Sequence, residues 1–491
     1  MQRRNGYGSL GYGFLAALLL CLAGPAWAGP VVEPVEQRRD AAATEPVEQR
    51  RDAAATVVHE FKLDNGLKLL VQEDHRAPVV VSQIWYKVGS SYEHSGLTGI
   101  SHALEHMMFQ GTPSVGPGEF ARIISANGGN QNAFTGRDYT AYFEQLEKSR
   151  LEIGFRLEAD RMGRLLLTDE AIAKELRVVA EERRLRTDDS PESLVYEQFT
   201  ATAYTTSPYR HPIIGWMSDI QSLQAGDLKR WYEQWYAPNN ATLVVVGDVD
   251  PQQVLELAKT YFGPLPSRAL PELRYTPEIP QPGERRLTVK TPAELPYILL
   301  GYKVPVLKTA QQSWEPYALE VLSGILNGGE SARLNRRLVR GGQLAASVGV
   351  DYDLESRLEA LFTLAANPAP GHTVAELEQS LRAEIKRLQD ELVSPEELAR
   401  VVAQVVAADV YQRDSLFYQA MRLGIFETVG LGWQALNDYV PRVQAVTPEQ
   451  IREVARNYLT DDRLTVAVLE PLPLAGNRPP PAGHGVGNMI H

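Results

Sequence analysis

The sequence predicts an α+β fold of two homologous domains, each an antiparallel-rich mixed sheet with helices packed on it. The roughly 415 residues with helix and strand patterns are too many for one hydrophobic core. Six prolines between positions 264 and 282 are typical of a linker. Residues 223–247 and 446–468 share a pattern, in which a capped helix leads to a tyrosine and a β-rich strand. We therefore expect domains over 57–265 and 284–473, joined by a linker over 266–283.

Hydrophobic periodicity predicts the elements of each domain in chain order. The first domain opens with antiparallel strands, followed by the helix and strand segments that carry the candidate site. The expected strands are 59–63, 67–72 around the Asn65-Gly66 turn, and 79–88; the expected helices are 98–110 and 168–186. In the second domain we expect helices over 317–326, 374–392 and 395–408.

The N-terminus has the pattern of a secretory signal peptide over residues 1–28. Two arginines precede a short apolar run, Phe14 to Leu22, and a small-residue cleavage site ends at Ala28. The run is too short for a transmembrane helix. We therefore expect a periplasmic protein with no membrane span. The one cysteine, Cys21, lies inside the signal, so the mature chain would have no disulfide.

A tandem duplication lies between the signal and the fold. The twelve residues from Glu33 to Thr44 recur unchanged from Glu45 to Thr56. They alternate charges with alanines and contain no aromatic residue, so they can bury little surface. We expect residues 29–56 to be a flexible tether or a frayed helix, and the Pro- and Gly-rich tail, 474–491, to be flexible. The net charge of −12 disfavours nucleic acid and anionic membranes as partners.

The pentapeptide His102-Ala-Leu-Glu105-His106 is the most informative motif. Residues four apart on a helix are neighbours, so the two histidines can bind one metal ion. Glu105 can take a proton from a water molecule that the metal activates. Apolar neighbours and the stop signal at Gly111 predict a packed helix, where unpaired polar groups are costly. The order His-x-x-Glu-His is the inverzincin pattern and predicts a catalytic zinc site rather than two solvated histidines.

Zinc requires a third protein ligand, which we expect on another helix. Residues 168–186 form a suitable helix, with Thr168 as N-cap, acids in the first turn and arginines in the last. Glu175 and Glu182 are seven residues apart and share one apolar face. The neighbouring Glu181, Arg183 and Arg184 fit an exposed, charged face.

These motifs resemble the pitrilysin/insulysin metallopeptidases, a family that includes mitochondrial processing peptidase and small bacterial relatives. The family has His-x-x-Glu-His, about 75 residues, and then Glu-x6-Glu, whose second Glu binds zinc. In this chain 75 residues separate His106 from Glu182. The resemblance implies one Zn²⁺ held by His102, His106 and Glu182, with Glu105 as general base and Glu175 as a supporting carboxylate. Glu181 is the nearest rival for the third ligand, but the seven-residue register favours Glu182.

The resemblance extends over residues 57–471 and implies a clam-like half-chamber that encloses a peptide substrate. Residues 128–135, followed by Tyr139 to Tyr142, are similar to the family's strand beside the zinc, whose free edge pairs with the substrate. Alternation along this segment suits a strand, and an unpaired edge can accept a peptide by β-augmentation. The residues expected to bind substrate are Asn132, Ala133, Phe134 and Thr135. An ordinary hairpin is the alternative.

The second domain carries no His-x-x-Glu-His and should form the other wall of the chamber. In single-chain members of the family this half supplies an Arg-x6-Tyr pair that contacts the reacting carbonyl. The equivalent positions here are Val339 and Ala346, so the pair is missing. We expect a heterodimer with a homologous subunit that lacks the zinc motif and contributes these groups, since oxyanion stabilisation is a large part of catalysis. The alternative is a homodimer in which Arg340 or Tyr352 takes the role.

Two other functions are alternatives to a zinc endopeptidase. A catalytically silent binding or assembly subunit of the same fold would be expected to lose Glu105 or a histidine, and all are present. A metal-dependent hydrolase of other substrates is disfavoured by the peptide-binding pattern at 132–135. The physiological substrate and its cleavage preference do not follow from the sequence.

Overall fold

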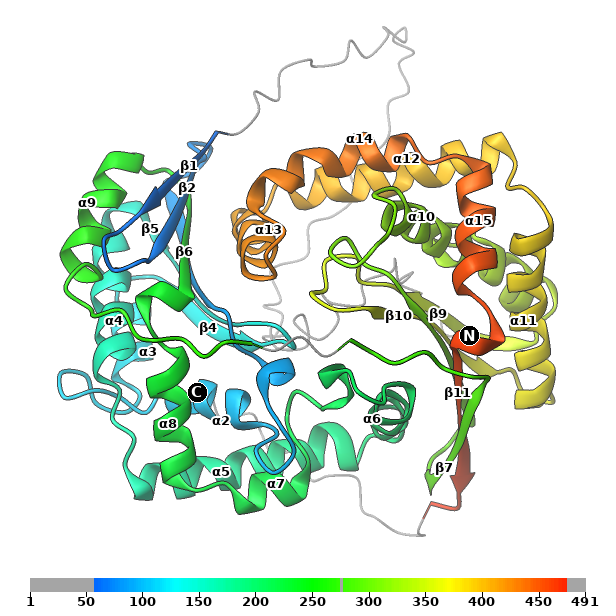
Figure 1. The fold of residues 1–491 in the computed structure, drawn as a ribbon, viewed down its shortest axis with the longest axis horizontal. Coiled ribbons are helices and arrows are strands. Elements are labelled where there is room, and N and C mark those ends of the chain that lie inside the picture. Colours follow the sequence, from blue (N-terminus) through cyan, green and yellow to red (C-terminus); the bar gives the residue numbers. More distant parts are fainter. Residues whose placement is uncertain (1–56, 274–276, 475–491) are drawn as a thin grey trace, which may run out of the picture.

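The computed structural model describes residues 57–273 and 277–474. Two mixed sheets, one in each half of the chain, carry the fold (Figure 1). The first sheet has the order β1-β2-β6-β3-β5-β4 and the second the order β7-β11-β8-β10-β9. The strands are β1 (Val58–Lys62), β2 (Lys68–Glu73), β3 (Val79–Tyr86), β4 (Asn130–Thr135), β5 (Thr140–Glu147), β6 (Ala241–Gly247), β7 (Arg285–Pro292), β8 (Tyr297–Val304), β9 (Ala345–Asp351), β10 (Ala360–Pro368) and β11 (Leu464–Leu472). The predicted signal peptide, tandem repeat and all but the first residue of the predicted tail lie outside the described residues.

Helices cover both sheets, and their order along the chain is similar in the two halves (Figure 1). Helices of the first half are α2 (Ile100–Met107), α3 (Glu119–Ala126), α4 (Leu151–Arg164), α5 (Asp169–Arg183), α6 (Pro191–Ala203), α7 (Met217–Ser222), α8 (Ala225–Trp235) and α9 (Pro251–Tyr261). Helices of the second half are α10 (Glu315–Asn327), α11 (Val374–Asp390), α12 (Pro395–Gln412), α13 (Leu416–Thr428), α14 (Tyr439–Gln444) and α15 (Pro448–Tyr458). Two mixed sheets with packed helices confirm the predicted α+β class.

One predicted strand pairing was wrong. β1 and β2 pair antiparallel as expected, but β2 does not pair with β3. β6 lies between them, parallel to β2 and antiparallel to β3. Every residue of β6 is buried, which suits a strand at the centre of a sheet covered on both faces. A strand that arrives from more than 150 residues away cannot be placed by local pattern.

One helix of each half packs on the sheet of the other half. α13 packs on β3 and β6 of the first sheet, while α6 packs on β7 and β11 of the second. The contacts are close, since a Cβ on Gly424 of α13 would lie 2.0 Å from the Trp85 ring. A Cβ on Gly301 of β8 would lie 2.3 Å from the Phe199 ring of α6. Packing of this density ties the two halves together.

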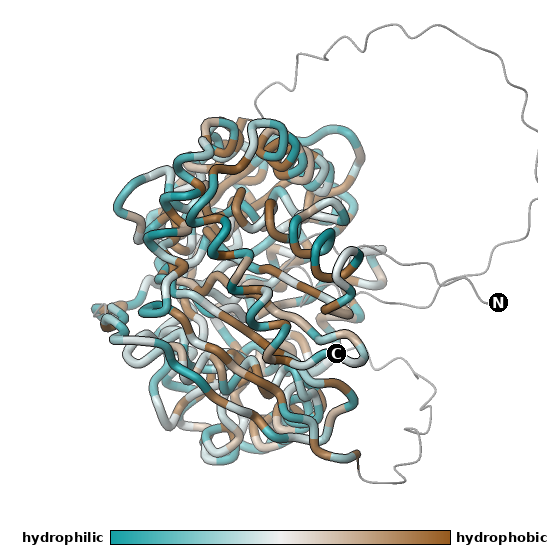
Figure 2. The backbone as a smooth tube through the Cα atoms, turned by 90° about the vertical axis from the view of Figure 1, so that its right-hand side faces the viewer, coloured by the Kyte–Doolittle hydropathy of each residue, from teal (hydrophilic) through white to brown (hydrophobic). Residues whose placement is uncertain are grey.

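The interior is mostly apolar. None of the described helices has the length and hydrophobicity needed to cross a bilayer. Figure 2 shows hydrophobic and hydrophilic stretches alternating along the chain, as expected for elements with one buried face. The two faces of the first sheet pack into separate clusters, and the cluster around Ile84, Leu104 and Met107 contains the helix that carries the His-x-x-Glu-His motif. The candidate site is therefore built on the core of the first half.

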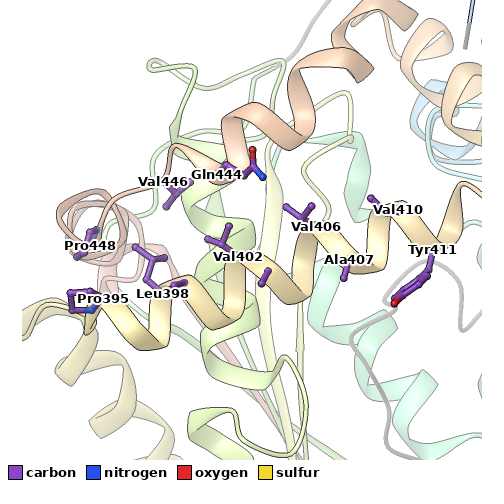
Figure 3. A pocket seen from close by; sticks show the side chains of 12 residues that line it. Pro395, Leu398, Val402, Val406, Ala407, Val410, Tyr411, Gln444, Val446 and Pro448 are labelled. Carbon is purple, nitrogen blue, oxygen red and sulfur yellow. The ribbon is translucent and has the colours of Figure 1, made fainter. Parts of the chain in front are cut away.

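An apolar groove of about 960 Å³ runs along α12 (Figure 3). Its lining includes Ala403, Ala407 and Val410, and Val410 is 52% exposed. α5 in the first half and α12 in the second half hold corresponding places in the chain. When residues are counted from the two N-caps, Thr168 and Ser394, the positions in α5 and its end that match Ala403, Ala407 and Val410 are charged: Arg177, Glu181 and Arg184. The apolar face of α12 is therefore a property of its sequence and not a requirement of the repeated fold.

Candidate metal centre

The helix that carries the motif, α2, is shorter than predicted and begins at an unusual cap. Gly99 precedes it with a φ of +84°, and a Cβ there would lie 2.4 Å from the carbonyl oxygen of Ile214. The cap is supplied from outside the helix, since the Glu93 carboxylate accepts the backbone N–H groups of Gly99 (2.7 Å) and Ser101 (2.8 Å). A carboxylate at a helix N-terminus satisfies free donors and stabilises the helix dipole. Sequence reasoning missed Glu93, because capping from so far upstream of a helix has no local signature.

Two histidines and one glutamate converge on a single point. His102 and His106 project from successive turns of α2, and Glu182 reaches them from α5. The Glu182 Oε2 atom lies 3.2 Å from Nε2 of His106 and 3.7 Å from Nε2 of His102. One ligand atom from each residue lies within 4.8 Å of the others, and across 57–273 and 277–474 no second group of this kind occurs. The structure thus brings together the three residues expected to bind the metal.

Glu175 lies two helical turns before Glu182 on the same face of α5 and contacts His106. Its Oε2 lies 3.6 Å from Nδ1 of His106, on the side of the ring away from Glu182. Its Oε1 accepts a 3.0 Å hydrogen bond from Nε2 of Gln110. A carboxylate on the outer nitrogen of a ligand histidine orients the ring and fixes its tautomer. This geometry matches the supporting role expected for Glu175.

The donor set fits a divalent metal ion. Burial and the neighbouring His106 lower the pKa of His102 to about 3, so this imidazole is neutral, as a metal ligand must be. Burial alone would lower the pKa of His106, but Glu175 and Glu182 outweigh it and raise the pKa to about 10. Burial alone would raise the pKa of Glu182, yet the two histidines and Arg186 bring it down to about 2. A carboxylate and two imidazoles, of which His102 is neutral and His106 must give up its proton when a metal ion binds, match a zinc site with three protein ligands.

Glu105 lies beside the three candidate ligands and next to the first sheet. Its carboxylate accepts a hydrogen bond from the hydroxyl of Thr135, the last residue of β4. Burial raises the pKa of Glu105, an effect that suits a group that must accept a proton. The contact with Thr135 places the candidate general base directly against the strand expected to bind substrate.

β4 is an edge strand, paired in the described structure with β5. The backbone N–H of Ala133 donates 2.9 Å to the side chain of Asn132, so it is directed away from β5. Phe134 packs against Trp85 with ring centroids 5.4 Å apart and anchors the strand. Asn132, Ala133, Phe134 and Thr135 therefore lie on a strand whose outer edge can pair with an extended peptide.

Three other candidates from the sequence, a rival metal ligand and two possible contacts of the substrate carbonyl, make other interactions. Glu181 is 66% exposed and paired with Arg184, and it is not part of the cluster of His102, His106 and Glu182. The Tyr352 hydroxyl donates 2.6 Å to the carbonyl oxygen of Pro305 inside the core. Arg340 contacts Glu330.

The sequence and the fold both match known proteins. Residues 68–216 match the family model described as Insulinase (Peptidase family M16), and residues 222–405 match the one described as Peptidase M16 inactive domain. A protein named zinc protease PqqE from Helicobacter pylori is 34% identical over 416 residues, which cover 83% of this chain and 92% of that protein. The chain belongs to the M16 peptidase family. The predicted resemblance is thereby confirmed.

Solved M16 structures agree with the fold. A protease from Helicobacter pylori superposes with a TM-score of 0.81 at 32% identity, covering 85% of this chain and all of that one. The periplasmic protease PqqL from Escherichia coli matches in fold, with a TM-score of 0.71 at 20% identity. That match covers 84% of this chain but 47% of PqqL, so the M16 chain described here has the size of one PqqL half. All candidate metal and base residues lie within the part matched to the Insulinase model.

Proposed function

We propose that this M16 chain is a zinc-dependent endopeptidase of the periplasm that hydrolyses peptides or unfolded segments held in a chamber. The observation that carries the proposal is the convergence of Nε2 of His102, Nε2 of His106 and Oε2 of Glu182 beside Glu105. The zinc proteases among its relatives support the choice of metal. The predicted signal peptide supports the compartment.

The roles of the chain's own residues follow from their positions. A bound zinc ion supplies Lewis-acid activation of water and of the scissile carbonyl. His102, His106 and Glu182 would hold the ion, and Glu175 would keep the His106 ring in place. Glu105 accepts a proton from the attacking water and donates it to the leaving amine. The outer edge of β4 holds the substrate backbone next to Glu105 by strand pairing.

We also propose that catalysis depends on a partner, a homologous subunit that lacks the zinc motif. Val339 and Ala346 occupy the positions where an arginine and a tyrosine were expected. Tyr352 and Arg340, the candidates for a substitute, form hydrogen bonds within their own half. Oxyanion stabilisation is usually a large contribution to acyl transfer, so these groups must come from elsewhere. The size match to one half of PqqL supports pairing with a second half.

A direct experiment separates these proposals. The mature chain would be purified, its zinc content determined by elemental mass spectrometry, and its action on unstructured peptides assayed with Glu105→Gln as the inactive control. Zinc at one ion per chain with hydrolysis by the wild type supports the peptidase. Full activity without a partner overturns the heterodimer, and zinc binding with activity restored by a co-purified subunit supports it. Absence of zinc overturns the whole proposal.

A further inference from the structure

Arg186 approaches the metal-binding carboxylate from the side opposite the histidines. Its Nη1 lies 2.6 Å from Oε1 of Glu182, while Oε2 of the same carboxylate faces both imidazoles. We propose that Arg186 is a positioning residue for the metal site, holding Oε1 so that Oε2 alone is presented to the ion. This inference rests on the proposed function. It assigns a residue outside the predicted site and outside the His-x-x-Glu-His and Glu-x6-Glu patterns.

The segment that carries Arg186 has a defined course. It is a π-helical turn, Arg184–Asp188, that follows α5 directly. The residue before the turn, Arg183, is buried and donates to both carboxylate oxygens of Glu197 (2.6 and 2.8 Å) and to the carbonyl oxygen of Gly215 (2.8 Å). This anchor fixes the turn against α6 and the loop before α7.

The ion pair of Arg186 involves a carboxylate that is largely withdrawn from solvent, since the side chain of Glu182 is 16% exposed. A carboxylate in such a position is costly to leave without its charged partner. The pair therefore stabilises the orientation in which Oε1 faces the turn and Oε2 faces the two histidines.

A neighbouring ion pair provides a matched control. Arg184 lies on the same turn and pairs with Glu181, and this pair is exposed and separate from the histidines. An ordinary surface ion pair contributes little to stability. If Arg186 were only such a pair, its removal would resemble removal of Arg184. If it positions a metal ligand, its removal lowers the affinity for the metal, typically about 10–100-fold for an outer-shell partner.

The test measures zinc affinity by competition with a chromogenic chelator, using the full mature chain. We expect Arg186→Ala to raise the zinc Kd about 10–100-fold, Arg186→Lys to recover part of the loss because it keeps a charged donor, and Arg184→Ala to bind zinc as the wild type does. Circular dichroism melts of the metal-free proteins should be alike, which separates positioning from loss of structure. Hydrolysis should fall through kcat, with KM little changed.

Each outcome decides the question. If the wild type binds zinc and Arg186→Ala binds it as tightly or more tightly, the inference is wrong while the proposed peptidase stands. Equal losses in Arg184→Ala and Arg186→Ala would also overturn it, since the effect would then belong to the charge of the turn. A wild type without zinc affinity would overturn the proposed function and this inference with it.

Discussion

Arg357, from the second half of the chain, donates a 2.9 Å hydrogen bond from Nε to Oδ1 of Asp138 in the turn between β4 and β5 of the first half. Asp138 is buried and also accepts from the Ser91 hydroxyl (2.7 Å) and the Tyr209 hydroxyl. The guanidinium of Arg357 lies 4.7 Å from the centroid of the Tyr92 ring. The hairpin of β4 and β5, which contains the candidate substrate-binding strand, is thus attached to the opposite half.

Removal of this contact should destabilise the protein. Arg357→Ala leaves Asp138 as a buried carboxylate without its charged partner, a change that costs about 3–5 kcal/mol when a buried pair is broken. We expect a loss of about 3 kcal/mol in the free energy of unfolding, measured by urea denaturation. Arg122→Ala, which removes an exposed pair with Glu119, should change it by less than about 1 kcal/mol. Equal effects of the two variants would contradict the assigned role of Arg357.

Glu105→Gln should separate metal binding from turnover. Glutamine keeps the shape of the side chain and the contact with Thr135 but cannot take a proton. We expect zinc content to be unchanged and kcat to fall by about 10²–10⁴-fold, the range for removal of a general base. Peptide hydrolysis and elemental analysis on the same preparation measure both. A fully active variant would show that another group is the base.

The two neighbouring glutamates of α5 give a matched pair for the third ligand. Glu182→Ala should weaken zinc binding by more than about 100-fold, beyond the range for outer-shell partners, and His102→Ala should do the same. Glu181→Ala removes a carboxylate one residue away that is exposed and paired with Arg184, and it should bind zinc normally. Equilibrium dialysis with metal quantification reports all three. Normal zinc binding by Glu182→Ala would contradict the ligand set.

Strand pairing at β4 predicts a backbone effect on substrate binding. Ala133→Pro removes the N–H that is directed away from β5. We expect KM for an extended peptide to rise several-fold, as loss of one hydrogen bond costs about 0.5–1.5 kcal/mol. Ala133→Ser keeps the N–H and should resemble the wild type. If proline at this position leaves KM unchanged, substrates do not pair with this segment of the edge.

The environment of Glu278 leads to a prediction of how the free energy of unfolding depends on pH. Its carboxylate accepts a 2.6 Å hydrogen bond from Lys303 and the backbone N–H groups of residues 205–207. Burial alone would raise the pKa of Glu278, but these bonds lower it to about 2 from an ordinary 4.5. A carboxylate with a lowered folded-state pKa stabilises the fold above its unfolded pKa and loses that effect as pH falls through the folded value.

The wild type should therefore lose stability between about pH 4.5 and pH 2, and Glu278→Gln should lose less over the same window while being less stable at neutral pH. Denaturation midpoints at a series of pH values measure both curves. Glu470→Gln, at an exposed pair with Lys290, is the control. Parallel curves for wild type and Glu278→Gln would contradict this assignment.

The candidate site could be predicted from the sequence because it depends on local spacing. His102, Glu105 and His106 share one helix, and Glu175 and Glu182 share another, so helical periodicity places them on common faces. Thr168 accepts from the N–H of Ala171 as the predicted N-cap. The pairing of the two helices came from the family resemblance.

The features that were not predicted depend on tertiary contacts. Glu93 caps α2 across a loop, β6 inserts between β2 and β3 from more than 150 residues along the chain, and α13 crosses to the other half's sheet. In the sequence, Arg186 is an ordinary basic residue at the end of a helix. Its contact with the Glu182 carboxylate can be recognised only in the folded structure, where Glu182 faces the two histidines. Tertiary packing decides such features, and hydrophobic periodicity carries no information about them.

The proposed activity depends on His102, His106 and Glu182 holding one zinc ion together. Crystals of the mature chain grown with zinc, with diffraction recorded on both sides of the zinc absorption edge, would locate the ion. We expect one anomalous peak per chain, bounded by Nε2 of each histidine and by Oε2 of Glu182. A map without a peak there, or with its only peak at other side chains, would show that these three residues do not form the zinc site.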